Sequence, residues 1–267
     1  MVGRRIGYLT YGLVAYLAFV GVVLYALGFV GGWLVPRSID AGGPSSPASV
    51  ALAIDLSLLA LFAVQHSVMA RRSFKRVWTR LVPEPLERST YVLCASACLA
   101  LLFAAWRPLP HVLWTVDQPV LRRALVALSL VGWGTALVST FLIDHLHLFG
   151  VRQVSLGAAK GEPGPGRFRT PGLYRLVRHP LYLGFLVAFW AAPTMTVGHL
   201  VFSLAMLGYV LIGIRHEERD LVQQFGERYL EYRRRVRALI PLPRGRAGSS
   251  GRGESRTFGP SERSAEG

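Results

Sequence analysis

Two groups of ionisable residues flank an apolar stretch in the last third of the chain. Arg178 and His179 directly precede Pro180, and Glu217 and Glu218 follow at the far end of the stretch. If the stretch folds as a membrane hairpin, both groups lie on the same face of the bilayer. A cationic group and an acidic pair that meet at the mouth of an apolar helix bundle are suited to bind a small zwitterionic molecule.

Each residue type in this cluster favours a particular contact. Pro180 is well placed as a first helical residue, where the positive end of the helix dipole attracts an anion, and Arg178 adds a bidentate donor. The acidic pair can accept hydrogen bonds from an ammonium group or ribose hydroxyls, and Tyr174 and Tyr182 offer faces to an adenine or a sulfonium. These contacts together match S-adenosylmethionine. The same spacing also fits an ion-pair cluster that faces the lipid headgroups and only orients the hairpin.

The composition places this cluster in a membrane protein. Of the 267 residues, 52% are hydrophobic, and the mean hydropathy is +0.37, which is too apolar for an ordinary soluble domain. The first long apolar run lacks the short core and cleavage site of a signal peptide. The runs that we expect to span the bilayer are Tyr8–Val30, Val50–Met69, Ser89–Trp106 and Ala124–Ile143.

The remaining apolar segments, 180–192 and 200–214, are each shorter than a full span, so we expect a helical hairpin packed inside the bundle. From Glu217 to Ala238, apolar residues recur every three or four positions with arginines on the other face. This pattern predicts an amphipathic helix on the cytoplasmic membrane surface. The fold class is therefore all-α: a polytopic membrane bundle of four spans plus the hairpin, with five or six transmembrane helices.

The polar segments 71–88 and 151–165 are expected to be loops. We expect residues 1–240 to form a single integral-membrane domain, whose cofactor-binding part covers about 166–240. The segment 241–267 is rich in Gly, Ser and Arg, which predicts a disordered cytoplasmic tail.

Charge sets the expected orientation. The net charge is +15, and with the N-terminus inside and six crossing segments, 26 of the 30 basic residues lie inside and 4 outside. By the positive-inside rule, both termini and both polar groups are then cytoplasmic, in a bacterial inner membrane. The rule also accounts for the positive charge without nucleic acid, for which the sequence has no motif. The oligomeric state is left open.

Two ionisable residues lie within the second apolar run. His66 is near its cytoplasmic end, at the same membrane level as Arg178 and Glu218. A neutral histidine there could accept a substrate proton, or it could simply bond a backbone carbonyl at the headgroup level. Asp55 lies deeper and could pair with another helix.

No metal site is expected. The cluster Asp144-His145-Leu146-His147 could bind a metal ion, but a solvated helix end explains it better. Cys94 and Cys98 are one helical turn apart without a nearby histidine, so they are better explained as small packing residues than as zinc ligands.

A multi-part pattern runs through the last third: Gly172-x-Tyr174, Arg178-His179-Pro180-x-Tyr182-x-Gly184, Glu217-Glu218 and Phe225-Gly226-x-x-Tyr229-x-x-Tyr232. This pattern resembles the C-terminal signature of the isoprenylcysteine carboxyl methyltransferase and phospholipid methyltransferase superfamily of integral-membrane enzymes. In that superfamily the region binds S-adenosylmethionine at the cytoplasmic face. The resemblance implies a cofactor site made of Tyr174, Arg178, His179, Pro180, Tyr182, Glu217 and Glu218.

Three upstream blocks, Leu61–Ala70, Val82–Tyr91 and Leu148–Gln153, resemble bacterial methanethiol S-methyltransferases; the related NnrU-like membrane proteins share the layout. The resemblance implies S-adenosylmethionine-dependent methyl transfer to the sulfur of a small thiol, giving dimethyl sulfide from methanethiol. Another acceptor and an NADPH-dependent membrane reductase are the alternatives.

The candidate catalytic residues are His66, Arg178 and Glu218. A cationic environment around Arg178 would lower the pKa of the thiol, and His66, His179 or Glu218 could take its proton. The sequence does not choose among these bases.

Overall fold

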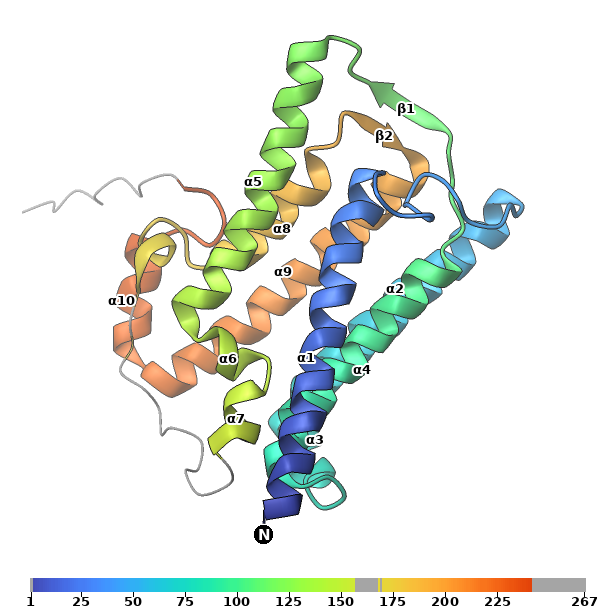
Figure 1. Ribbon diagram of the computed structural model, residues 1–267. Coiled ribbons are helices and arrows are strands. Elements are labelled where there is room, and N and C mark those ends of the chain that lie inside the picture. The colour runs from blue at the N-terminus through green and yellow to red at the C-terminus, as the bar shows by residue number, and fades with distance from the viewer. Residues whose placement is uncertain (1, 157–167, 169, 242–267) are drawn as a thin grey trace, which may run out of the picture.

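The computed structural model describes residues 2–156, 168 and 170–241 (Figure 1). Apart from residue 241, the expected tail at 241–267 lies outside the described residues. Within them, five helices are long and apolar enough to cross a membrane. They are α1 (Val2–Gly31), α2 (Ala48–Ala70), α4 (Glu84–Ala105), α5 (Pro119–Ile143) and α9 (Val197–Phe225). All four expected spans are present, which confirms the polytopic helix bundle.

The shorter elements are α3 (Arg72–Trp78), α6 (His145–Leu148), α7 (Val151–Leu156), the 3₁₀ turn η1 (Gly172–Arg175), α8 (Pro180–Trp190) and α10 (Glu227–Arg235). Two expected loops are therefore partly helical. The stretch 71–88 contains α3 and the first turn of α4, where Pro85 and the acidic Glu84 and Glu87 favour a helix start. The stretch 151–165 begins with α7.

A small sheet departs from the all-α expectation. Strand β1 (Val112–Thr115) pairs antiparallel with β2 (Thr194–Thr196), with an irregularity in register between Val112 and Trp114. The pairing satisfies backbone groups of two segments that connect helices at this end of the bundle. It joins the segment after α4 to the turn between α8 and α9.

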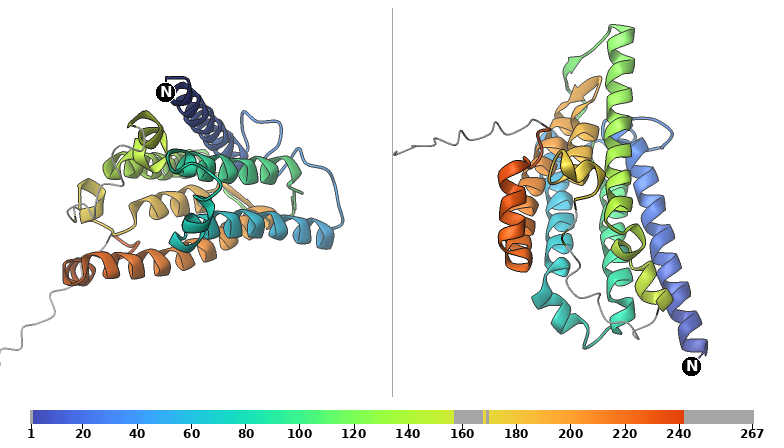
Figure 2. Two further views of the ribbon diagram at one scale, coloured as in Figure 1. Left: turned by 90° about the horizontal axis from the view of Figure 1, so that it is seen from below. Right: turned by 90° about the vertical axis from the view of Figure 1, so that its left-hand side faces the viewer.

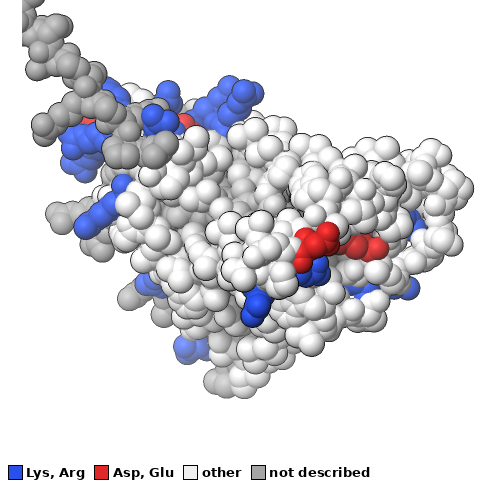
Figure 3. All heavy atoms as spheres, turned by 90° about the horizontal axis from the view of Figure 1, so that it is seen from above, with Lys and Arg blue, Asp and Glu red and all other residues white. Residues whose placement is uncertain are grey.

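The helices place two sets of connections at opposite ends. The N-terminus, α3 and α7 lie at one end, and β1, β2 and the loop 32–47 lie at the other (Figures 1 and 2). Viewed from the β1–β2 end, most of the surface is uncharged, and basic side chains gather towards one edge (Figure 3).

Helices α5 and α8 cross with their backbones in contact. A Cβ atom on Gly132 would lie 2.7 Å from the Gly184 oxygen, and one on Gly184 would lie 2.6 Å from the Gly132 oxygen. Small residues allow such a close approach between membrane helices. Gly134, on the same helix, faces open space, because no atom lies within 4 Å of the position that a Cβ would take there.

Helix α9 differs most from the expectation. It runs unbroken from Val197 to Phe225, whereas the sequence indicated a short apolar piece followed by a separate amphipathic helix from Glu217. No proline or glycine separates Ile214 from Glu217, so the helix continues. It ends at Gly226, whose φ of +57° favours glycine, and α10 follows. The acidic pair therefore belongs to the spanning helix.

Candidate functional site

The chain after α10 folds back against the start of α8. Val177 and Arg237 form a parallel bridge. The amide of Arg178 donates to the Arg237 oxygen at 2.9 Å, and that of His179 donates to the Ala238 oxygen at 3.0 Å. These contacts bring the Arg178 side chain to the C-terminal end of α10.

The Arg178 guanidinium is held by the protein itself. Its Nε and Nη2 donate to Glu218 Oε1 at 2.8 and 2.5 Å, and its Nη1 donates to the backbone oxygens of Arg233, at 3.2 Å, and Val236. The side chains of Arg178 and Glu218 are only 6% and 14% exposed. Arg178 therefore fixes the Glu218 carboxylate and the end of α10, rather than presenting a free fork to a ligand.

The two glutamates differ in how fully they are bonded. Glu218 Oε1 also lies 3.2 Å from His179 Nε2. Glu217 is 46% exposed, its Oε2 lies 3.6 Å from His179 Nδ1, and it stands beside the Tyr182 phenol. The His179 ring stacks on Tyr182 with centroids 5.7 Å apart, and His179 precedes the first helical residue of α8, Pro180, as expected. Glu217 is thus the more available carboxylate.

An aromatic cluster lies beside this ion pair. Phe168 packs against Tyr229 and Tyr232. The Tyr232 hydroxyl donates to the backbone carbonyl oxygen of Tyr174 at 2.5 Å. Burial raises the pKa of Tyr232 to about 12, although Arg178 opposes the shift, and burial also raises the pKa of Tyr229. Both phenols therefore stay protonated and can donate hydrogen bonds at neutral pH. The Tyr229 hydroxyl is buried without a hydrogen-bond partner among the described residues.

His66 lies in a second polar group, between α2, α4 and α9. Its Nε2 is 2.8 Å from the Tyr91 hydroxyl, and its ring approaches that of Tyr209 at 6.2 Å between centroids. Its Nδ1 is buried and has no hydrogen-bond partner within the described part of the chain. The simpler alternative required a hydrogen bond from His66 to a backbone carbonyl. Nδ1 makes no such bond, and Nε2 faces the Tyr91 hydroxyl instead.

Tyrosines connect this group to the hairpin. The phenols of Tyr91 and Tyr209 lie within electrostatic range of Tyr182, which stands beside Glu217. Sequence reasoning did not single out Tyr91 or Tyr209 as site residues. Tyr91 ends one of the upstream blocks, and Tyr209 lies two helical turns before Glu217 on the same face of α9. That helical spacing was a signal that could have found Tyr209.

Other polar residues have structural partners. Asp55 is fully buried, and its Oδ1 accepts from the Arg107 amide at 2.9 Å, so its partner is the segment after α4 and not another helix. His145 is also buried, with Nε2 2.9 Å from the Tyr16 hydroxyl and Nδ1 2.7 Å from Thr140 Oγ1. The expectation of a solvated helix end was therefore wrong for His145, whose pKa burial lowers.

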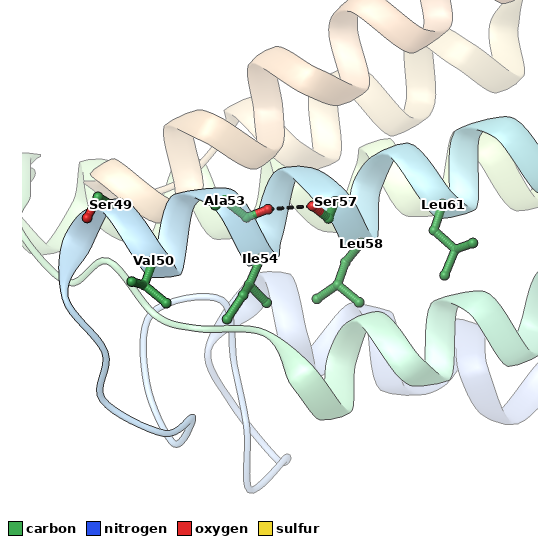
Figure 4. Close-up of a pocket in the computed structure, with 7 residues that line it drawn as sticks. All are labelled: Ser49, Val50, Ala53, Ile54, Ser57, Leu58 and Leu61. Atoms are coloured by element: carbon green, nitrogen blue, oxygen red, sulfur yellow. Dashed lines mark hydrogen bonds between the residues drawn. The ribbon is translucent and has the colours of Figure 1, made fainter.

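Among the described residues, no three of His, Cys, Asp and Glu are grouped to hold a metal ion, and Cys94 and Cys98 are free thiols. A hollow of about 540 Å³ lies elsewhere, along one face of α2 (Figure 4). It is mainly apolar and has the character of a lipid-facing groove. Its lining residues are Ser49, Val50, Ala53, Ile54, Ser57, Leu58 and Leu61.

Comparison with known proteins identifies relatives over most of the chain. Residues 56–242 match the model of the NnrU protein family. Methanethiol S-methyltransferase 1 of Bradyrhizobium diazoefficiens is 54% identical over 88% of this chain and 82% of its own length. Methanethiol S-methyltransferase of Mycobacterium tuberculosis is 52% identical over 88% of this chain and 97% of its own length.

A more distant relative is nurim of Rattus norvegicus, which is 33% identical over 64% of this chain and 68% of its own length. No solved structure matches the chain. The extent and identity of the matches leave no ambiguity about kinship: the chain belongs to the NnrU protein family, together with proteins named methanethiol S-methyltransferase.

Proposed function

We propose that this protein transfers a methyl group to the sulfur of methanethiol and so forms dimethyl sulfide, with S-adenosylmethionine as the methyl donor. The observation that carries the proposal is that, over 88% of the chain, more than half of the aligned residues are identical to those of proteins named for this reaction. The polar cluster at the α8–α9 hairpin supports it as a place for a zwitterionic cofactor.

The residues present fit the cofactor. Glu217 is a half-exposed carboxylate with capacity for an ammonium group or ribose hydroxyls. The buried Tyr229 hydroxyl and Arg237 Nε have no partner in the described chain, and both can donate to a carboxylate. Tyr182 adds an aromatic face. The proposed cofactor site comprises Tyr174, Arg178, His179, Pro180, Tyr182, Glu217 and Glu218.

When bound, S-adenosylmethionine supplies an activated methyl group, so the chain has to hold the thiol, remove its proton and exclude water. A small alkyl thiol has a pKa above about 8.5, so little thiolate exists at neutral pH. His66 is the proposed base. If its Nε2–H donates to the Tyr91 oxygen, its unpartnered Nδ1 carries the lone pair that accepts the thiol proton.

Arg178 and Glu218 are proposed to set the charge around the site. Because the guanidinium already binds Glu218 and two backbone carbonyls, Arg178 acts mainly by holding that carboxylate in place. Its positive charge still favours an anionic sulfur nearby.

We further propose that both termini are cytoplasmic, in a bacterial inner membrane. The five long apolar helices support a multi-pass protein. With the shorter apolar helix α8 taken as the sixth crossing segment, 26 basic residues fall on one side, which supports this orientation. A reporter fused after Ile240 that is active only in the periplasm would contradict this topology.

Activity is tested with the purified full chain in lipid nanodiscs. With S-adenosylmethionine and methanethiol we expect dimethyl sulfide in the headspace and an equal amount of S-adenosylhomocysteine. NADPH should neither stabilise the protein nor be consumed. Stabilisation by S-adenosylhomocysteine without product from methanethiol would retain the cofactor and reject the acceptor, and a panel of other thiols would then follow. No response to the cofactor would reject the proposal as a whole.

A further inference from the structure

A second hollow lies at the end of the molecule that carries α10, outside the proposed methyl-transfer site. It has a volume of about 320 Å³ and is lined by polar and aromatic residues. Three arginines and one carboxylate contribute to the lining, which leaves it strongly positive. The lining residues are Phe168, Thr170, Arg175, Arg228, Glu231, Tyr232, Arg235 and Val236.

The three arginines of this hollow are available to a ligand. The guanidinium groups of Arg175, Arg228 and Arg235 form no ion pair or hydrogen bond with any residue in the described part of the chain. Arg228 and Arg235 lie two turns apart on one face of α10, and η1 supplies Arg175 to the same hollow. Convergent, unpaired guanidinium groups are typical of sites for phosphate, because their planar donors match its oxygens.

This chemistry does not suit S-adenosylmethionine. That cofactor carries a net positive charge and no phosphate, whereas the hollow carries three cationic side chains against Glu231 alone. The proposed cofactor residues Glu217 and Glu218 lie on α9, and neither lines the hollow. The hollow therefore requires a different occupant.

The surroundings of the hollow favour a lipid. Leu176, next to Arg175, is 61% exposed, and Ile240, beyond α10, is 55% exposed. The bridge between Val177 and Arg237 holds these two segments side by side. Exposed apolar side chains beside basic ones are typical of a surface that enters the interfacial layer of an anionic membrane.

The geometry points to a binding site for the phosphate headgroup of an anionic phospholipid, formed by Arg175, Arg228 and Arg235 between η1 and α10. The lipid would fasten the C-terminal part of the chain to the cytoplasmic leaflet. Arg178 donates to the carbonyls of Arg233 in α10 and of Val236 directly after it, so occupancy of the hollow would also stabilise the hairpin cluster.

The test measures the thermal unfolding midpoint of the full chain in nanodiscs of phosphatidylcholine with increasing phosphatidylglycerol. The wild type should become more stable as phosphatidylglycerol rises. The triple variant Arg175→Gln, Arg228→Gln, Arg235→Gln should lose most of this rise. Losing one charge-assisted hydrogen bond to a phosphate costs about tenfold or more in affinity, so losing the three arginines should lower the apparent affinity for phosphatidylglycerol at least about a hundredfold.

A matched control removes the same charge elsewhere. Arg76, Arg80 and Arg215 are exposed and do not line the hollow, so their triple glutamine variant should keep the phosphatidylglycerol response. Equal loss in both triple variants would show a general charge effect and overturn the proposal. The proposal would also be overturned if inorganic phosphate alone stabilised the wild type as much as the lipid does.

The affinity for S-adenosylhomocysteine separates this site from the proposed function. In one fixed lipid mixture, the hollow variant should bind S-adenosylhomocysteine within about threefold of wild type per folded molecule. A much larger loss, with the lipid response intact, would assign the hollow to the cofactor site instead. Failure of methyl transfer by the wild type would leave the lipid measurement standing, because that readout needs no activity.

Discussion

The two halves of the bundle are held together in different ways. In the half formed by α5, α8 and α9, two backbones touch at Gly132 and Gly184, and Arg178 is saturated by Glu218 and backbone carbonyls. In the half formed by α2 and α4, polar atoms remain unpartnered within the described chain, including His66 Nδ1 and Gln65 Oε1. The contact between α5 and α8 is therefore built as a fixed frame, although a polar atom without a hydrogen-bond partner among the described residues also occurs in that half, at His199 Nδ1 on α9. The polar groups around His66 are ones that the proposed thiol substrate can satisfy.

The largest effect is expected at the fixed frame. Gly184→Val would force side-chain atoms into the α5 backbone, because even a Cβ there lies 2.5 Å from the Ala136 nitrogen. We expect little folded protein in the membrane. The measurement is the yield of monodisperse protein in size-exclusion chromatography after extraction in detergent. Gly134→Val on the same α5 helix is the control and should behave like wild type, because that position faces open space. Similar yields for the two variants would contradict the close backbone contact.

The next largest effect is expected at His66, in the half formed by α2 and α4. His66→Asn keeps a hydrogen-bonding group but cannot take a proton at neutral pH, so turnover should fall about 10²- to 10⁴-fold. Cofactor affinity should be unchanged. Raising the pH from 7 towards 10 should partly restore the rate, because more of the thiol is then already ionised.

His145 provides the matched control. It is also a buried histidine bonded to a tyrosine, but both of its ring nitrogens have partners. His145→Asn should lower the unfolding midpoint and leave turnover per folded molecule near wild type. A His66→Asn variant with normal turnover at every pH would remove His66 from the mechanism.

A smaller effect is expected at the ion pair. Glu218→Gln removes the charge that faces Arg178, and losing a charged hydrogen bond costs roughly 1.5–3 kcal/mol, or about ten- to a hundredfold in cofactor affinity. Calorimetric titration with S-adenosylhomocysteine measures this. Arg178→Ala should weaken binding in the same direction and also destabilise α10, whose terminal carbonyls lose their donor.

Glu227→Gln is the control for this charge change, because Glu227 pairs with Arg234 at an exposed position of α10. Its cofactor affinity should equal that of the wild type. If Glu218→Gln also bound normally, the cluster would be an ion pair that only orients the hairpin.

The smallest effect is expected at Tyr91. Tyr91→Phe removes the hydroxyl at 2.8 Å from His66 Nε2 and leaves the ring. The tautomer of His66 is then no longer fixed, so kcat should fall several-fold with KM for methanethiol little changed. The pH profile of kcat should shift, which loss of packing alone would not cause. An unaltered pH profile would assign Tyr91 to packing against His66.

The sequence predicted the spans well because long uncharged runs have few alternatives to crossing a bilayer. It failed where a boundary depended on local backbone detail. The charge of Glu217 and Glu218 suggested a new helix, yet an existing helix continues through polar residues until Gly226 breaks it. The pairing of β1 with β2 had no periodic signal, since each strand is very short.

The candidate site was predicted in part. Spacing and resemblance together brought Arg178, His179 and Glu218 into one cluster, and the structure places them in contact. Their roles stay predictions. Tyr91 and Tyr209 were missed because they belong to apolar runs, where a tyrosine is usually a packing residue, and only the tertiary arrangement brings them near His66.

The length of α9 has a consequence for how reactants would arrive. Its 29 residues extend for about 43 Å, at 1.5 Å per residue, while the hydrocarbon layer is about 30 Å thick. Glu217 and Glu218, towards the end of this helix, therefore lie at the boundary between the hydrocarbon layer and water. In the proposed reaction, a charged donor dissolved in the cytoplasm and a volatile thiol dissolved in the lipid meet at this boundary, and each approaches from the phase that it prefers. The membrane then acts as the reservoir for the thiol and as the outlet for the sulfide.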